Sequence, residues 1–209
     1  MTHASSEPLP QALFDRLDPS PDSLFYQSPR FVAHIDDKTI EALTNYYQET
    51  LFEDADVLDL MSSWISHLPI EPKLGRIAGL GMNQMELEAN PRLSDSVVQD
   101  LNADPVLPYK TESFDFVLIA VSIQYLIRPV DVFAEIARIL RSSGQVVVAT
   151  SHRCFPTKAI RGFQESSIDD RLQLISEYMR RAVAFEAPVI VDRSPHGADP
   201  LWLVTGAKR

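Results

Sequence analysis

The chain has 209 residues and a formal net charge of -10 at pH 7. This length fits one α/β domain with a substantial core, and the acidic charge argues against a nucleic-acid partner or binding to an anionic membrane. The single cysteine, Cys154, excludes an intrachain disulfide and a zinc site built from cysteines. The N-terminus has no secretory signal, and the longest apolar run, residues 116–121, is too short to span a bilayer. We therefore expect a cytoplasmic protein.

Residues 1–33 are predicted to form an arm outside the main domain, which covers residues 34–209. Five prolines interrupt any long element in the arm, so we expect a loosely structured segment with one short helix near residues 11–17. Beyond the arm, Ile40, Leu43 and Tyr47 recur at helical spacing, and an aspartate in front of them supplies an N-cap. The pattern predicts an amphipathic helix that leads into the domain.

Five short apolar runs follow and alternate with helical patterns. Continuous runs of valine, isoleucine and leucine are typical of parallel strands that are buried on both faces. Between the fourth and fifth runs, Val132, Phe133 and Ile136 belong to the apolar stripe of a predicted helix over residues 130–140. The five runs are residues 57–60, 76–80, 97–99, 116–121 and 145–150.

The last quarter of the chain has a different pattern. A helix is predicted over residues 168–179, and two strand-like segments follow at residues 189–191 and 202–205. The loop between these two segments is too short for a crossover helix, so they should form an antiparallel hairpin. The predicted fold class is a doubly wound α/β sheet of seven strands, mostly parallel with a C-terminal antiparallel hairpin and helices on both faces.

In such a sheet, ligands bind outside the carboxyl ends of the strands, and the first strand end carries a recognisable motif. Asp59 lies in this strand and is followed by a predicted turn into a helix, made of Met61, Ser62, Ser63 and Trp64. The string resembles the first motif of class I (Rossmann-like) S-adenosylmethionine-dependent methyltransferases. It looks like a methyltransferase type 11-like branch whose first motif is degenerate. The resemblance covers about residues 55–206.

The resemblance implies that S-adenosylmethionine is the cofactor and that these loop residues contact it. The family's turn is Gly-x-Gly-x-Gly, which lets the backbone approach the methionine end of the cofactor closely, and no glycine of that turn is kept here. Ser62 and Ser63 are small enough to admit the ligand and would offer hydroxyls and helix-start amides to its carboxylate. The alternative is that the two serines only cap the following helix.

The second strand end departs from the family in a further way. Gly81 stands where the resemblance implies an acidic residue that accepts both ribose hydroxyls. Met82 and Asn83 follow it as expected cofactor contacts, with Asn83 as a weaker substitute for the carboxylate. Glu86 and Glu88 are expected in solvent on the next helix.

The third strand end matches the family better. Asp100 falls where the resemblance implies a side chain that binds the adenine amino group, and Leu101 and Asn102 complete the expected adenine site. The alternative is a turn aspartate that accepts hydrogen bonds from its own backbone.

The fourth and fifth strand ends are expected on the side of the methyl acceptor. Val121 and Ser122 are predicted cofactor contacts, and Tyr125 follows them. Tyr125 and His152 are the candidate general bases, because an oxygen or nitrogen acceptor needs a group that takes its proton. A structural role is the alternative for His152. No spacing of histidine, aspartate and glutamate suggests a metal site.

Two further groups of charged residues are expected to have no part in the chemistry. Glu135 and Arg138, three residues apart on a helix, should form a structural ion pair. A solvated surface is expected for the scattered basic residues Lys158, Arg161, Arg180 and Arg181.

The sequence as a whole favours an enzyme that transfers a methyl group from S-adenosylmethionine to a small molecule. The alternative is a methyltransferase-fold protein without catalysis that serves as a binding or regulatory module, because the glycine turn and the ribose carboxylate are missing. A nicotinamide oxidoreductase is excluded, since no Gly-x-Gly-x-x-Gly follows any strand.

Overall fold

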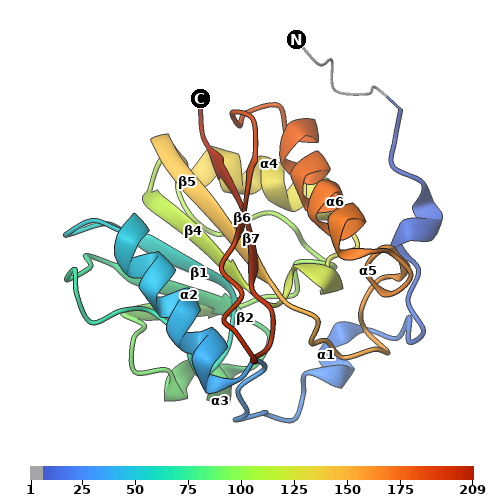
Figure 1. Cartoon of the computed structure of the whole chain (residues 1–209), viewed down its shortest axis with the longest axis horizontal. Helices are drawn as coiled ribbons and strands as arrows, with labels where there is room; N and C mark the ends of the chain where they lie inside the picture. The colour runs from blue at the N-terminus through green and yellow to red at the C-terminus, as the bar shows by residue number, and fades with distance from the viewer. Residues whose placement is uncertain (1–6) are drawn as a thin grey trace.

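The computed structural model describes residues 7–209, which form a seven-stranded sheet in the order β3-β2-β1-β4-β5-β7-β6 (Figure 1). The first five strands in this order are parallel, and β7 runs antiparallel to both β5 and β6. The predicted sheet and its C-terminal hairpin are therefore confirmed. The strands are β1 (Val57–Ser62), β2 (Ile77–Gly81), β3 (Asp95–Val98), β4 (Phe114–Ala120), β5 (Leu140–Thr150), β6 (Val189–Asp192) and β7 (Trp202–Ala207).

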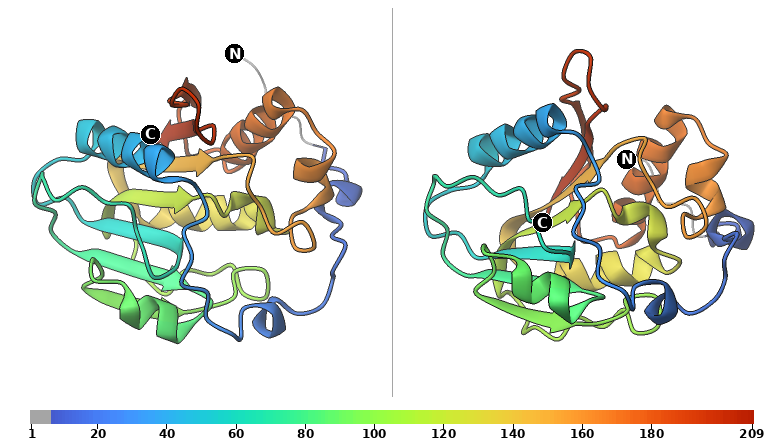
Figure 2. Two further views of the ribbon diagram at one scale, coloured as in Figure 1. Left: turned by 60° about the horizontal axis from the view of Figure 1, so that its bottom comes forward. Right: turned by 90° about the horizontal axis from the view of Figure 1, so that it is seen from below.

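Helices cover both faces of this sheet, as predicted (Figure 2). The long helix α2 (Asp37–Thr50) begins at the predicted aspartate cap, where the Asp36 carboxylate accepts a hydrogen bond from the Thr39 amide at 2.9 Å. The other long helices are α4 (Pro129–Ile139) and α6 (Ile168–Arg181). Shorter helical segments are η1 (Gln11–Phe14), α1 (Asp22–Phe25), α3 (Gln84–Ala89), η2 (Ile123–Tyr125) and α5 (Arg161–Gln164).

The sheet separates two apolar cores. Successive side chains of a strand point to opposite faces, so Val117 and Ile119 of β4 pack with α4 and α6, whereas Phe116 and Leu118 pack with α2. Both faces of the central strands are thus covered by apolar groups. This arrangement explains why the central strands have continuous apolar runs in place of an alternating pattern.

The connection from β1 to β2 contains no helix, contrary to the prediction. Two prolines interrupt helical hydrogen bonding in residues 63–76, and His67 adopts a positive φ of 52°. The segment is held from outside instead, because the Ser66 hydroxyl accepts a hydrogen bond from Asn90 Nδ2 at 2.8 Å. The connection from β3 to β4, residues 99–113, also lacks a helix.

The N-terminal arm is packed against the domain, not loosely structured as expected. The predicted short helix is present as η1, while residues 1–6 of the arm lie outside the described part of the chain. The arm is tied to the loop after β5 by backbone hydrogen bonds from Asp18 to the Thr157 carbonyl and from Arg161 to the Asp15 carbonyl, both at 2.8 Å. It then follows the edge of the sheet at which the parallel strands end (Figures 1 and 2).

Lys158, in the loop after β5, binds this arm. It is fully buried, in contrast to the solvated position expected from the sequence. Its ammonium group lies 3.1 Å from Asp18 Oδ2 and 3.2 Å from Asp22 Oδ1. It also donates to the Ser20 carbonyl at 2.7 Å. Since an isolated buried charge is very costly, Lys158 holds its carboxylate and carbonyl partners, and the arm that carries them, in place.

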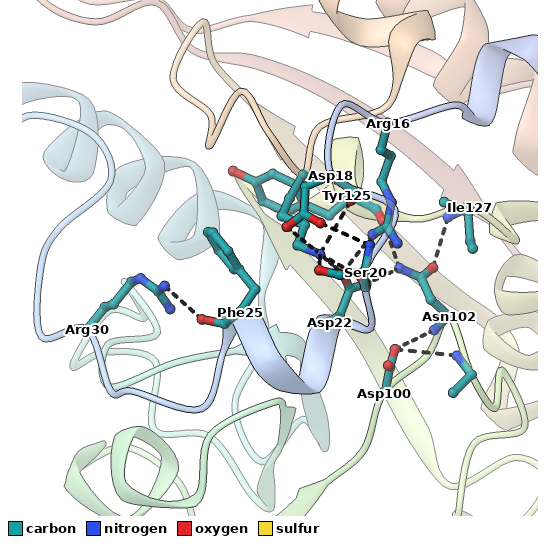
Figure 3. Close-up of polar contacts among 12 residues, drawn as sticks. Arg16, Asp18, Ser20, Asp22, Phe25, Arg30, Asp100, Asn102, Tyr125 and Ile127 are labelled. Atoms are coloured by element: carbon teal, nitrogen blue, oxygen red, sulfur yellow. Dashed lines mark hydrogen bonds and ion pairs between the residues drawn. The ribbon is translucent and has the colours of Figure 1, made fainter.

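Asp22 extends the buried network to the domain. Its carboxylate accepts two hydrogen bonds from Arg16 Nη1 at 2.8 Å and one from Asn102 Nδ2 at 2.7 Å (Figure 3). The Asp22 carboxylate therefore contacts Arg16 of the arm, Lys158 after β5 and Asn102 after β3.

The remaining charged residues have simpler roles. The predicted pair of Glu135 and Arg138 is confirmed at 2.7 Å, and Arg161 and Arg180 are exposed as expected. No helix within residues 7–209 is long and apolar enough to cross a membrane.

Replacing Lys158 with methionine should destabilise the protein, because the buried Asp22 carboxylate and the partly exposed Asp18 carboxylate lose a cationic partner. We expect the free energy of unfolding to fall by about 3 kcal/mol, measured by chemical denaturation. The control is Lys110→Met at an exposed position, which should change stability by less than about 0.5 kcal/mol. Equal stabilities of the two variants would contradict a structural role for the network.

Candidate functional site

A deep pocket lies at the carboxyl ends of β1, β2, β3 and β4, under the N-terminal arm. Its lining residues surround about 1070 Å³ of empty space, part of which is open to solvent. The floor is formed by residues at the four strand ends, and the roof by Tyr26 and Arg30 of the arm, His34 directly after the arm and Phe155 after β5. Of the predicted cofactor contacts, the following line it: Asp59, Met61, Ser62, Ser63, Gly81, Met82, Asp100, Leu101, Asn102, Val121 and Ser122.

The end of β1 is bent so that its side chains turn toward the pocket. Met61 has a positive φ of 61°, and the pairing with β2 skips it, so that Ser62 lies opposite Gly81. Because no helix follows, neither helix-start amides nor a helix-capping role is available to Ser62 and Ser63, and both interpretations of the sequence were wrong on this point. Trp64 does not line the pocket: its indole N–H donates to the Val32 carbonyl at 3.1 Å.

Asp59 is a buried carboxylate at the base of this bend. It accepts a hydrogen bond from the Ser62 hydroxyl at 2.6 Å. Burial raises the pKa of Asp59 to about 6, although hydrogen bonds from Ser62 and Ser66 favour the charged form. The site therefore holds a negative charge at neutral pH that is partly lost in mild acid.

The end of β2 supplies backbone, not side chains. Asn83 lies beside the pocket but faces the arm: its amide donates to the carbonyls of Tyr26 and Gln27 at 2.9 and 3.1 Å, and its oxygen caps α3. Both amide hydrogens of Asn83 are therefore used by the arm, and the residue is not among those that line the pocket. Glu86 was expected in solvent, but it is buried and its carboxylate lines the pocket. Glu88 is exposed, as expected.

The end of β3 combines a structural and a ligand-facing role. Asp100 Oδ1 accepts from the Asn102 amide at 2.9 Å, which is the turn geometry considered as the alternative. The same residue lines the pocket, so the two interpretations are compatible. Asn102 is committed to the fold: its side chain donates to Asp22 and to the Tyr125 carbonyl and accepts from the Ile127 amide (Figure 3).

Two hydroxyl groups follow the end of β4, and only that of Tyr125 has a hydrogen-bond partner among residues 7–209, whereas that of Ser122 has none. The Ser122 hydroxyl is buried and has no partner within the described residues, which suits a group awaiting a ligand. The Tyr125 hydroxyl accepts from the Phe155 amide at 2.8 Å, and burial raises the pKa of Tyr125 to about 12. A phenol that stays protonated and is bound in this way does not favour the role of general base expected for Tyr125.

The pocket is lined by two histidines, and neither is His152, the histidine predicted as a general base. His152 is exposed, pairs with Asp199 at 3.1 Å and lines a separate, smaller pocket after β5. His34 and His67 line the main pocket instead. Burial lowers the pKa of His67 to about 4 and also lowers that of His34. His67 Nδ1 is buried and has no partner within residues 7–209.

The sequence held one signal for each of these residues. His67 lies in the same string as Ser62 and Ser63, only four residues after Ser63. His34 lies two residues before the N-cap of α2, directly after the arm that was expected to be loosely structured. Only the folding of both segments over the strand ends brings the two imidazoles into one pocket.

Replacing Asp59 with asparagine should change how stability depends on pH. Because the pKa of Asp59 is about 6 in the folded protein and about 3.9 in an unfolded chain, the folded state binds the proton more tightly, and this group lowers stability as pH rises from about 4 to 6. The free energy of unfolding of Asp59→Asn relative to the natural protein should therefore increase by roughly 2–3 kcal/mol between pH 4 and pH 7. Parallel denaturation curves over this range would disprove the shift.

Comparison with known proteins agrees with the topology. The model of a family described as a methyltransferase domain matches residues 65–148. No curated protein matches the chain. The matched residues run from the loop after β1 into β5 and so include the ends of β2, β3 and β4 in the pocket.

Solved structures share the fold at low sequence identity. A structure of the complex between the Trm112 methyltransferase activator of Haloferax volcanii and its methyltransferase matches with a TM-score of 0.64 at 15% identity, covering 82% of this chain and 90% of that chain. The [4+2]-cyclase SpnF matches at 0.58 and 18% identity, covering 80% and 81%. Geranyl diphosphate C-methyltransferase from Streptomyces coelicolor matches at 0.55 and 15% identity, covering 81% and 77%. The sheet order and these solved structures show that the chain has the Rossmann-like fold of these proteins, within which residues 65–148 match the methyltransferase-domain model.

Proposed function

We propose that the protein transfers a methyl group from S-adenosylmethionine to a small-molecule acceptor. The observation that carries this proposal is a single pocket that joins the four strand ends to a roof formed by the arm. A pocket enclosed in this way favours an acceptor of modest size over a macromolecule. The similar structures include enzymes that their names describe as acting on geranyl diphosphate, a small molecule.

The residues of the pocket fit S-adenosylmethionine, the cofactor that the resemblance implies. Asp100 lies on the side expected for adenine, and Ser122, on the side expected for the acceptor, has a buried hydroxyl without a partner among residues 7–209. Ser62, Ser63 and the charged Asp59 lie at the end of β1, on the side expected for the amino-acid group, where Asp59 suits an ammonium. When bound, the cofactor supplies an activated methyl group on a sulfonium, so the protein chiefly orients donor and acceptor.

An acceptor oxygen or nitrogen also has to lose a proton. His67 is the best-placed group to take it, because it is neutral at physiological pH and its Nδ1 is buried without a partner among residues 7–209. His34 lies close enough for its charge to affect His67 and packs edge-on against Phe155, with 5.3 Å between the ring centroids. We therefore assign proton acceptance to His67, with His34 beside it.

A second candidate function is a binding module without catalysis. The irregular chain after β1 favours it, since no helix start is present there to hold the carboxylate of the cofactor. The fold alone does not decide between the two, because one protein with a similar structure is named as a [4+2]-cyclase. Cofactor binding followed by an acceptor screen separates the candidates.

Calorimetric titration of the full chain with S-adenosylhomocysteine tests the proposal first. We expect saturable binding that Asp100→Asn weakens about tenfold, because asparagine keeps the turn but loses the charged acceptor for the adenine amino group. Asp104→Asn is the matched control: Asp104 is also a turn residue, accepting from the Val106 amide, but it lies outside the pocket. Absence of binding at millimolar ligand would overturn both the enzyme and its cofactor site.

His67→Gln should slow turnover of an acceptor found by screening, on the order of 10²-fold, while leaving S-adenosylhomocysteine affinity nearly unchanged. In the natural protein, a folded pKa of about 4 keeps His67 neutral above pH 5. At saturating S-adenosylmethionine, where the bound ammonium keeps Asp59 charged, turnover should therefore stay level from pH 5 to 8 and fall only nearer pH 4. His196→Gln, at an exposed position, is the control. Unchanged turnover in His67→Gln, or a midpoint near pH 6.5, would rule out this role.

A further inference from the structure

We propose that Glu86, on the first turn of α3, is the carboxylate that holds the ribose hydroxyls of the cofactor in this chain. The inference rests on the proposed function and names a residue that the sequence pattern places in solvent. The resemblance implies that an acidic residue at the end of β2 binds the ribose hydroxyls, and we assign this contact to a residue of α3 instead. Three observations carry it: the crowding at Gly81, the position of Glu86 and its unused hydrogen-bonding capacity.

The end of β2 has no room for an acidic side chain. A Cβ added to Gly81 would lie 2.2 Å from the Ser62 carbonyl oxygen, which is a clash with backbone that no side-chain movement relieves. The cause is the bend at Met61, which sets Ser62 opposite Gly81. The carboxylate is therefore missing from position 81 because the backbone of β1 occupies its space.

Glu86 brings a carboxylate back to the same part of the pocket. Asn83 caps α3 with its side chain, accepting from the Glu86 amide at 3.2 Å, and so fixes the first turn of the helix. The Glu86 side chain is 7% exposed and lines the pocket together with Gly81 and Met82. A carboxylate that is buried this deeply on the first turn of a helix is held in a defined position and is not solvated.

The two oxygens of Glu86 are only half used. Oε1 accepts from the Arg30 amide at 2.7 Å, and Oε2 accepts from the Ser63 hydroxyl at 2.6 Å. A carboxylate has about four acceptor sites, so each oxygen keeps one for a further donor. A vicinal diol offers two O–H donors side by side, which matches the two remaining sites.

The same two hydrogen bonds connect the ribose site to the rest of the pocket. Arg30 belongs to the arm and Ser63 to the irregular chain after β1, so Glu86 joins both segments to α3. In this arrangement the carboxylate that binds the diol also helps to hold the roof in place.

The test compares S-adenosylhomocysteine with its analogue lacking both ribose hydroxyls, titrated calorimetrically into the full chain. In the natural protein we expect removal of the hydroxyls to weaken binding at least tenfold, because hydrogen bonds to a charged group are strong. In Glu86→Gln the difference between the two ligands should shrink to threefold or less. Glu88→Gln, with a glutamate exposed on the same helix, should discriminate like the natural protein.

Each outcome bears on a different claim. No binding of S-adenosylhomocysteine to the natural protein overturns the proposed function and this inference together. Binding of both ligands with equal affinity overturns the inference alone, and it needs no variant. If Glu86→Gln weakens both ligands by the same factor, the residue is only structural and the inference is wrong. Thermal unfolding checks that Glu86→Gln is folded. If that variant is unfolded, Glu86→Asp replaces it, because aspartate keeps the negative charge but is too short to reach the diol.

Discussion

The buried ammonium of Lys158 is the contact on which the rest of the site depends. It lies under the N-terminal arm and neutralises carboxylates that the arm carries, so that the arm is held across the strand ends. Without that attachment the floor of the pocket would be an open edge of the sheet. With it, Tyr26 and Arg30 of the arm and the adjoining His34 form a roof, and the strand ends become an enclosed pocket. Charge burial, which is often costly, here defines the volume in which a ligand can bind.

The bend at the end of β1 has a comparable effect on the cofactor side. Setting Ser62 opposite Gly81 brings the Asp59 carboxylate and the Ser62 hydroxyl into contact at the base of the pocket. The same bend removes the space for a side chain at position 81 and is followed by a chain without a helix. The missing glycine turn and the missing ribose carboxylate are thus one structural change, and not two independent losses.

Most of the fold could be predicted from the sequence, because its signals are local. Runs such as Val146–Val148 indicate strands buried on both faces, and the short loop before Trp202 indicates a hairpin. The site was predictable only where it follows directly from a strand end, as for Ser62, Asp100 and Ser122. Lys158 and Glu86 appeared to be solvated because their partners lie far away in the sequence. The helix expected after β1 came from the resemblance, and the prolines of that segment argued against it.

The separation between the arm and its partners also sets the order in which the protein can assemble during synthesis. Ser20 and Lys158 are 138 residues apart, and Asp22 and Asn102 are 80 residues apart. The arm leaves the ribosome first, yet its last attachment point appears only when β5 and the loop after it have been made. Contacts of such long range are late and entropically expensive steps in folding. The pocket can therefore be completed only after the loop that carries Lys158 has been made, when the parallel part of the sheet is already available.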